Sequence, residues 1–481
     1  MTFPPPESFR PIRAGALPIF RQDHREYALF YAPGYLAAVE LKQADAFEAS
    51  LSQPAATTIG ETALTGSSTP LALAVTQTMT WPAVVELRRH AAAAQQTWAE
   101  AHTRPFSPVC LMLYLNNECN LGCTYCYSNP SPRPGPRLEL ATVRAGAKLV
   151  AKNCRAQGQP FTLVFHGGGE PTLHQPLADR ILNEVEGIAA AYDLPIFRYI
   201  ATNGVMPPAK ATWVAERFDL IGLSCDGPES LQNQQRPLWG GGSSSPFVER
   251  TAQAVREAGK PLHARVTITP QSLRRQSEIA AYVCQQLKPQ EIHVEPIYKA
   301  GRARAEDCLT MDQVETFVEE FFKARAVARG YGIRWLMSGS RPGEIHGPYC
   351  HVFREVLNLV PGGAATACFK TTTAVQTRQQ EVMVGEMEAA SGCFSLDHDH
   401  IQSLRQALRL FPGKCGNCFN QYHCVRDCPD HCPLEGVRPS SEFGCQAQKK
   451  LVNALLQETA EALRITGTFV AGVVSGEVIV S

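Results

Sequence analysis

The sequence predicts an α/β protein built on a partial (β/α)6 barrel, with an N-terminal α+β unit and a cysteine-rich C-terminal domain. First, short apolar runs alternate with longer amphipathic stretches over residues 106–335, which is typical of parallel βαβ units. Second, there are too few such runs for a closed eight-stranded barrel. Third, the cysteines cluster in two regions, one within residues 106–335 and one within residues 336–481.

Residues 1–105 are predicted to form a separate unit. Tyr27 to Glu40 has the pattern of a β-hairpin with Pro33 and Gly34 in its turn. The stretch from Gln53 to Pro70 is rich in Ala, Thr, Gly and Ser and is expected to be a loop. Trp81 to Ala101 is rich in Ala and is expected to be a helix. No catalytic motif occurs in this unit.

The barrel segment places its unusual residues directly after its apolar runs. In parallel barrels the chemistry lies at the C-terminal ends of the strands, so we predict the functional site there. Cysteines follow the first run, a Gly-Gly-Gly-Glu segment the second, Thr-Asn-Gly the third and Ser-Cys-Asp-Gly-Pro the fourth. The runs begin at Leu111, Phe161, Ile196, Leu220, His263 and Glu291.

Composition excludes some classes of function. Of 481 residues, 45 are Lys or Arg and 45 are Asp or Glu, so the formal net charge is zero and no nucleic-acid partner is expected. No apolar run reaches the ~18 residues of a membrane helix, and prolines and arginines interrupt the N-terminal stretch. We therefore expect a cytoplasmic protein without a membrane segment. In that reducing compartment the 17 clustered cysteines indicate metal binding before disulfides.

The first cysteine cluster has the spacing C-x3-C-x2-C. Cys119, Cys123 and Cys126 supply three thiolates, which can hold three irons of a four-iron cluster and leave the fourth iron open for another ligand. The alternative is a zinc knuckle or a chance grouping of cysteines. Zinc normally takes four nitrogen or sulfur ligands, and here one is missing.

The segment CNLGCTYCY resembles the signature of the radical S-adenosylmethionine (SAM) superfamily. The resemblance covers about Ser107 to Lys449. It implies that the open iron chelates SAM and that reductive cleavage of SAM yields a 5′-deoxyadenosyl radical, which abstracts a hydrogen atom from the substrate.

The same resemblance implies a SAM-binding site made of several segments. An aromatic residue lies next to the adenine, and a Gly-Gly-Glu-Pro segment binds the methionine amino group. A glycine pair lets the backbone approach a ligand closely, and a carboxylate suits an ammonium group. The implied SAM-binding residues are Tyr125, Gly168, Gly169, Glu170, Thr202, Asn203, Ser224 and Arg236.

The C-terminal cysteines resemble the seven-cysteine SPASM domain of peptide-modifying radical enzymes. The family implies two auxiliary [4Fe-4S] clusters, and therefore three clusters in the chain. One would be held by Cys415, Cys418, Cys424 and Cys445. The other would be held by Cys350, Cys368 and Cys428.

The ligands of the second auxiliary cluster are left open. Relatives often supply a fourth cysteine just upstream of the first, and this chain has none there. Cys393, Cys432, a non-cysteine ligand or the substrate are the candidates for that place. Two zinc sites are the alternative, because C-x2-C with later cysteines is also a zinc-ribbon pattern.

The leading functional hypothesis is an oxidoreductase that modifies a ribosomally made peptide or a protein side chain, for example by a thioether or carbon–carbon crosslink. Its expected partners are the peptide or protein substrate and a flavodoxin- or ferredoxin-type reductant. The N-terminal unit is interpreted either as a module that recognises a leader peptide or as a structural cap on the barrel.

Two other functions remain as alternatives. The first is an anaerobic sulfatase-maturating enzyme, which makes formylglycine. Those enzymes carry a catalytic Asp directly after the cysteine that matches Cys368, whereas this chain has Phe369. The second is a non-catalytic iron–sulfur or zinc scaffold, which iron content and SAM cleavage would distinguish from an enzyme.

Overall fold

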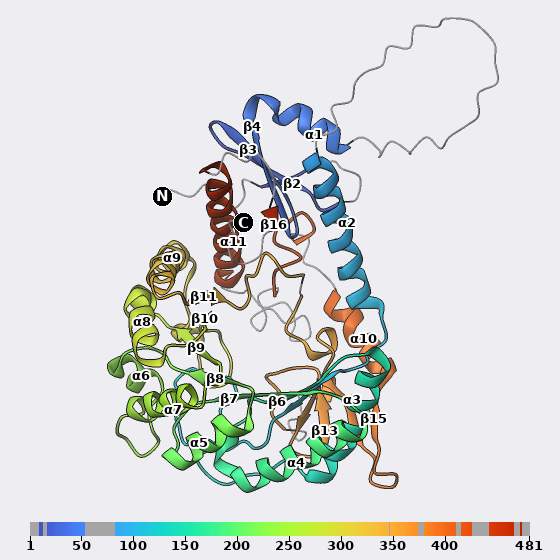
Figure 1. Cartoon of the computed structure of the whole chain (residues 1–481), viewed down its shortest axis with the longest axis vertical. Coiled ribbons are helices and arrows are strands. Elements are labelled where there is room, and N and C mark those ends of the chain that lie inside the picture. Colours follow the sequence, from blue (N-terminus) through green and yellow to red (C-terminus); the bar gives the residue numbers. More distant parts are fainter. Residues whose placement is uncertain are drawn as a thin grey trace, which may run out of the picture.

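The computed structural model describes residues 9–12, 17–52, 82–345, 347–373, 380–409, 415–425, 442–465 and 472–473. In Figure 1 an N-terminal sheet lies above a larger α/β body, and α11 lies beside that sheet. Among the described residues, no helix is both long and apolar enough to cross a membrane.

The larger body confirms the partial (β/α)6 barrel. The six apolar runs of the sequence form neighbouring parallel strands, and a further parallel strand, β11, extends them without closing the sheet. These strands are β5 (Cys110–Leu113), β6 (Phe161–Phe165), β7 (Ile196–Thr202), β8 (Leu220–Ser224), β9 (Leu262–Ile268), β10 (Glu291–Pro296) and β11 (Arg334–Met337).

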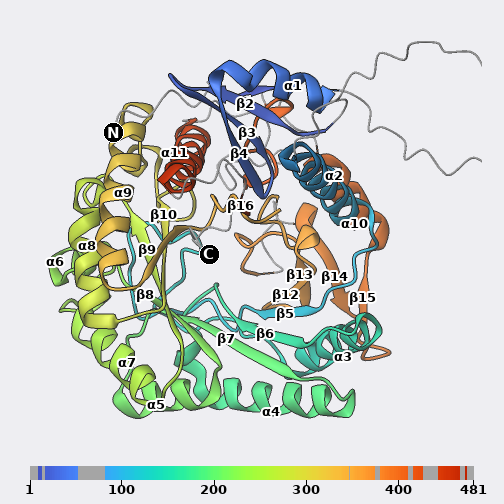
Figure 2. The same ribbon diagram turned by 45° about the horizontal axis from the view of Figure 1, so that its top comes forward.

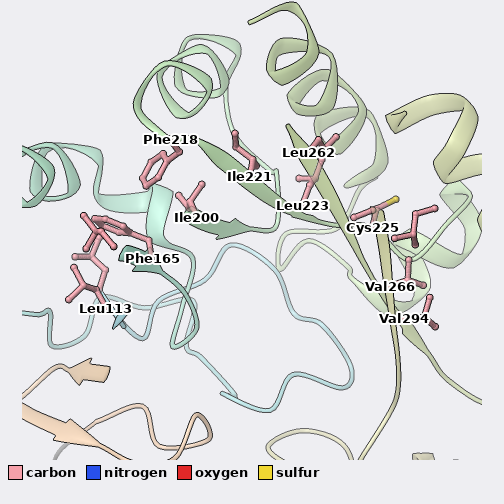
Figure 3. Close-up of a cluster of buried hydrophobic side chains, with 14 of the residues drawn as sticks. Leu113, Phe165, Ile200, Phe218, Ile221, Leu223, Cys225, Leu262, Val266 and Val294 are labelled. Atoms are coloured by element: carbon pink, nitrogen blue, oxygen red, sulfur yellow. The ribbon is translucent and has the colours of Figure 1, made fainter. Parts of the chain in front are cut away.

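Crossover helices cover the outer face of these strands, as Figure 2 shows for the arc from α3 to α9. They are α3 (Leu140–Gln157), α4 (Gln175–Ala191), α5 (Pro208–Arg217), α6 (Glu229–Gln235), α7 (Ser245–Glu257), α8 (Gln276–Tyr282) and α9 (Val314–Gly330). Between strands and helices lies an apolar core, where Phe165, Ile221 and Leu262 are completely buried (Figure 3). Alternate residues of β9 join this core, so the residues between them face the barrel interior.

The C-terminal part of the chain continues the barrel sheet. β12 (Val356–Val360) pairs in parallel with β5, and three antiparallel strands follow it. The predicted domain boundary at 335/336 lies within β11. The remaining elements are β13 (Ala364–Thr366), β14 (Met383–Met387), β15 (Phe394–Leu396), α10 (His398–Arg409) and α11 (Phe443–Ile465).

The N-terminal unit contains the predicted hairpin and the predicted helix. Ala32 pairs with Tyr35 across the turn, where Gly34 has φ +85°, a conformation that favours glycine. The predicted loop at 53–70 is outside the described residues. The sheet contains β1 (Arg10–Pro11), β2 (Phe20–Asp23), β3 (Tyr27–Ala32), β4 (Tyr35–Glu40) and β16 (Gly472–Val473), and the helices are α1 (Ala44–Ser52) and α2 (Pro82–Thr103).

One face of the N-terminal sheet packs on the C-terminal part of the chain. Phe9 stacks on Phe419 with ring centroids 4.9 Å apart, and Leu36 shares a buried cluster with Val452 and Leu456 of α11. Strand β16 also pairs with β4 at the edge of the sheet. The first and last parts of the chain therefore form one packed layer beside the barrel (Figures 1 and 2).

Candidate functional site

The loop after β5 brings the three predicted cluster ligands together. Cys119, Cys123 and Cys126 share one small apolar cluster, which also contains Leu121 and Val205. The thiol of Cys119 accepts a hydrogen bond from the backbone N–H of Leu121, with a sulfur–nitrogen distance of 3.4 Å. The loop therefore gathers three thiols at the C-terminal end of the first barrel strand.

The donor set fits an iron–sulfur cluster. Burial raises the pKa of Cys119 to about 12 and that of Cys123 to about 11, and the other thiols of the loop act in the same direction. Three thiolates at this place are disfavoured unless a positive partner compensates them. Iron supplies that charge and prefers thiolate sulfur, so Cys119, Cys123 and Cys126 are the residues that would hold the cluster.

The predicted glycine segment after β6 packs against the backbone that leads into the cysteine loop. A Cβ atom on Gly168, which has φ +69°, would lie 2.4 Å from the carbonyl oxygen of Asn116. A Cβ atom on Gly169 would lie 2.0 Å from the carbonyl oxygen of Glu118. Glycine is required here because the two loops approach closely, a role separate from the predicted contact with SAM.

Glu170 lies at the centre of a buried hydrogen-bond network. One carboxylate oxygen accepts bonds from the backbone N–H and hydroxyl of Thr172 and from the hydroxyl of Thr202, and the other accepts a bond of 2.8 Å from the backbone N–H of Asn203. Burial raises the pKa of Glu170, and these hydrogen bonds act against that effect. The Asn203 side chain in turn donates to the thiol of Cys119 at 3.6 Å. Glu170, Thr202 and Asn203 therefore connect the glycine segment to the cysteine loop.

Replacing Glu170 by Gln is expected to weaken SAM binding and to destabilise this network. Loss of a charge-assisted hydrogen bond of about 1.5–3 kcal/mol corresponds to a roughly 10- to 150-fold higher Kd. Both carboxylate oxygens accept hydrogen bonds in the network, so the amide NH2 of Gln would place one donor against another. The measurements are SAM affinity and iron content of the anaerobically reconstituted protein, with Glu278→Gln as a control that neutralises an exposed carboxylate outside the site. An unchanged Kd with the cluster intact would show that Glu170 does not face SAM.

Asp226 follows β8 and is completely buried, although it was not among the predicted site residues. Its carboxylate accepts hydrogen bonds from the hydroxyl of Tyr125, from the Gln235 amide at 2.8 Å, from Nε of Arg236 at 3.0 Å and from the backbone N–H of Thr267 at 3.0 Å. The Arg236 guanidinium also lies over the Tyr125 ring, 5.2 Å from its centroid.

Asp226 therefore orients two of the predicted SAM-binding residues, Tyr125 and Arg236. Ser224, another predicted SAM-binding residue, ends the same strand and pairs with Arg265 of β9. The only sequence signal for Asp226 was its place in the Ser-Cys-Asp-Gly-Pro segment.

Two of the three predicted ligands of one auxiliary cluster lie close together in the fold. Cys350 is buried, and Cys368 follows β13. The residues next to them, His351 and Ala367, share a backbone hydrogen bond of 2.8 Å. The third predicted ligand, Cys428, lies outside the described residues, as does Cys432.

The predicted ligands of the other auxiliary cluster lie in the segment of residues 415–425 and on α11. The backbone N–H of Cys418 donates to the carbonyl of Cys415 at 3.1 Å. The thiol of Cys424 donates to the side-chain oxygen of Gln448, and Gln448 lies on α11 with Cys445. The ligation of both auxiliary clusters stays a prediction.

A cavity of about 380 Å³ lies between the cysteine loop and the auxiliary region. Tyr127, the residue after Cys126, lines one side, and Phe369, the residue after Cys368, lines another. Their ring centroids are 5.5 Å apart. The residue that replaces the sulfatase-type Asp therefore faces the space next to the predicted radical cluster.

Glu295 is the only carboxylate among the described residues that line this cavity. Burial raises its pKa, and the backbone N–H of Ser338 donates to one of its oxygens at 3.0 Å. Burial lowers the pKa of His166 to about 4 and that of His351 to about 3, so both imidazoles are neutral and weakly basic at pH 7. Among the lining groups, Glu295 is the one best suited to accept a proton.

A separate group of His263, Glu291 and His293 has its ligand atoms within 4.8 Å of one another. It lies at the starts of β9 and β10, away from the strand ends that carry the cysteine loop. Arg334 already pairs with Glu291. Burial, followed by the charge of Arg265, lowers the pKa of both histidines. These positive neighbours oppose a bound cation, so this group is interpreted as structural.

Part of the chain matches a known protein family. Residues 113–279 match the Radical SAM superfamily. The chain is 26% identical over 170 residues to the cysteine-type anaerobic sulfatase-maturating enzyme of Clostridium perfringens. The aligned region covers 35% of this chain and 46% of that enzyme. It is 28% identical over 150 residues to the serine-type enzyme of Klebsiella aerogenes, covering 30% of this chain and 37% of that enzyme. The chain thus spans less than half the length of these curated relatives.

Solved structures show the same fold. The structure of native anSMEcpe with bound AdoMet has a TM-score of 0.57 at 17% identity and covers 74% of this chain and 100% of that one. Streptococcus suis SuiB bound to its precursor peptide SuiA has a TM-score of 0.50 at 14% identity and covers 90% of this chain and 98% of that one. The family match, together with the gathered cysteines, identifies residues 113–279 as a radical SAM domain.

Proposed function

We propose that this enzyme modifies a side chain of a peptide or protein, using one SAM-binding [4Fe-4S] cluster and two auxiliary clusters. The observation that carries the proposal is the cavity between the loop of Cys119–Cys126 and the Cys350–Cys368 region. When bound, the cluster and SAM supply a 5′-deoxyadenosyl radical that abstracts a hydrogen atom. The residues of the chain bind the substrate, orient it and exclude water.

The cavity offers polar contacts as well as apolar walls. Nδ1 of His166 and Nε2 of His351 are buried and have no hydrogen-bond partner among the described residues. Buried polar atoms are normally paired, so these two nitrogens are suited to bind amide or hydroxyl groups of a substrate. Peptides carry such groups, and SuiB and anSMEcpe, which share the fold, have been solved with peptides.

A second candidate is the formation of formylglycine in a sulfatase. It is favoured by the identity to both types of sulfatase-maturating enzyme and by Glu295, a carboxylate within the cavity. That reaction removes a hydrogen atom, a proton and a further electron from Ser or Cys, so it needs a base. Phe369 cannot serve, and Glu295 reaches the cavity from β10, a different position from that of the sulfatase-type Asp.

We expect the enzyme not to convert sulfatase peptides to formylglycine, because the carboxylate after the auxiliary cysteine is missing. The test incubates reconstituted enzyme, SAM and reductant with Cys- and Ser-type sulfatase peptides, followed by mass spectrometry. Formylglycine produced at a rate comparable with 5′-deoxyadenosine would reverse the ranking of the two functions. In that case Glu295→Gln should abolish the product while SAM cleavage continues.

A further inference from the structure

Two residues from distant parts of the chain bind the backbone carbonyls of all three loop cysteines. The indole N–H of Trp239 donates to the carbonyl of Cys119 at 3.1 Å. The guanidinium of Arg302 donates to the carbonyl of Cys123 at 3.1 Å, and the backbone N–H of Arg302 donates to the carbonyl of Cys126 at 3.0 Å. Trp239 follows α6 and Arg302 follows β10, so the fold brings three loops together here.

The two side chains also stack on each other. The Arg302 guanidinium lies 4.8 Å from the centroid of the Trp239 ring. A Cβ atom on Gly122 would lie 3.4 Å from that ring, so the indole covers the cysteine loop directly. Gly301 has φ +59°, and a Cβ atom there would lie 2.2 Å from the carbonyl of Cys126. The close contact between the Arg302 segment and the loop therefore requires glycine at position 301.

A simple surface contact does not account for this arrangement. Trp239 is 47% exposed, and an exposed cation–π pair is worth only about 0.5–1 kcal/mol. A cation–π contact alone would not explain why the two residues also donate hydrogen bonds to the carbonyls of three residues of one loop. Arg302 also donates to the carbonyl of Pro130, so its guanidinium is held in one orientation beside the loop.

We propose that Trp239 and Arg302 are positioning residues for the iron–sulfur cluster: together they clamp the loop of Cys119–Cys126 and place a fixed positive charge beside it. The clamp holds the backbone of the three ligands in one conformation, which slows loss of the cluster. The charge stabilises the reduced cluster, because reduction adds a negative charge nearby. Outer residues that donate hydrogen bonds or carry charge are known means of tuning such clusters.

The experiment compares four variants in the full-length, anaerobically reconstituted enzyme. Arg302→Gln removes the charge, and Trp239→Phe keeps the ring but loses the N–H. Arg302→Lys keeps the charge but lacks the planar fork whose separate nitrogens reach the carbonyls of Cys123 and Pro130. Arg304→Gln is the matched control, because Arg304 is two residues away and its side chain is 78% exposed. The readouts are the midpoint potential of the SAM-binding cluster by EPR and the rate of cluster loss to a chelator. Signals of the auxiliary clusters are subtracted with the variant in which Cys119, Cys123 and Cys126 are Ala.

We expect a more negative midpoint potential for Arg302→Gln, and the wild-type potential for Arg302→Lys, Trp239→Phe and Arg304→Gln. Cluster loss should be several-fold faster in all variants except Arg304→Gln. Equal potentials in Arg302→Gln and wild type would overturn the role of the charge. Loss rates of Arg302→Lys and Trp239→Phe equal to that of Arg304→Gln would overturn the clamp. If Arg302→Gln does not retain the cluster, the loss rates of Trp239→Phe and Arg302→Lys decide the test of the clamp. A midpoint potential of Arg302→Lys that differs from wild type would then overturn the role of the charge, because this variant keeps the charge.

Discussion

SAM cleavage is expected to disappear when Cys119, Cys123 and Cys126 are replaced together by Ala. These thiols share one buried apolar cluster at the end of the first barrel strand, and the structure offers no replacement cysteine in that cluster among its described residues. A four-iron cluster that loses all three protein ligands has no anchor, and SAM then has no iron to chelate. Production of 5′-deoxyadenosine should fall to the background of the uncatalysed reaction, which is the largest effect we predict.

The measurement is 5′-deoxyadenosine and iron per chain, taken anaerobically after reduction. We expect about eight irons to remain, because each of the two auxiliary clusters holds four. Cys154→Ala is a suitable control, because Cys154 is buried in the main core, away from this loop. Normal 5′-deoxyadenosine from the triple variant would contradict the assignment of the loop. Loss of all iron would contradict the independence of the auxiliary clusters.

Replacing Asp226 by Asn is expected to cost about 3–5 kcal/mol of stability, because it leaves the buried Arg236 without a compensating charge. Asp226 is completely buried and accepts four hydrogen bonds, so an Asn amide would place its own donors against some of these donors. A loss of this size is a large fraction of the stability of an ordinary domain. The freed Tyr125 and Arg236 should also bind SAM less well.

The free energy of unfolding of Asp226→Asn, measured by denaturation, is compared with that of two other variants. In the double variant Asp226→Asn, Arg236→Met the unpaired cation is removed, so part of the lost stability should return. In Glu278→Gln an exposed ion pair with Arg275 is broken, and the change should stay within about 0.5 kcal/mol. A single Asp226→Asn variant as stable as Glu278→Gln would show that the Asp226–Arg236 pair contributes little.

Most of the barrel could be predicted because its signals are local. Each of the six strands is a short apolar run between helix-like segments, and the hairpin of β3 and β4 has alternating side chains around a Pro-Gly turn. Cys119, Cys123 and Cys126 could be proposed as cluster ligands because their spacing lies within one loop. Such features need no knowledge of contacts between distant residues.

The remaining features could not be predicted because their partners lie far apart in the sequence. Nothing near Arg302 or Trp239 shows that both bind the loop of Cys119–Cys126. The barrel sheet continues into β12, although about 240 residues separate it from its partner β5. Glu295 and Phe369 meet in one cavity although they come from different parts of the chain.

By itself the sequence determined the order of strands and helices, the loop of the first three cysteines and the superfamily to which they point, because backbone periodicity and ligand spacing are local properties. Only the tertiary structure decided which groups contact that loop and its neighbours. Asp226 accepts hydrogen bonds from Tyr125 and Arg236, and Trp239 and Arg302 bind the loop carbonyls. Glu295 becomes the carboxylate among the described residues that line the cavity. The physical reason is that burial, charge compensation and close approach depend on which distant segments pack together, and packing is a property of the whole chain.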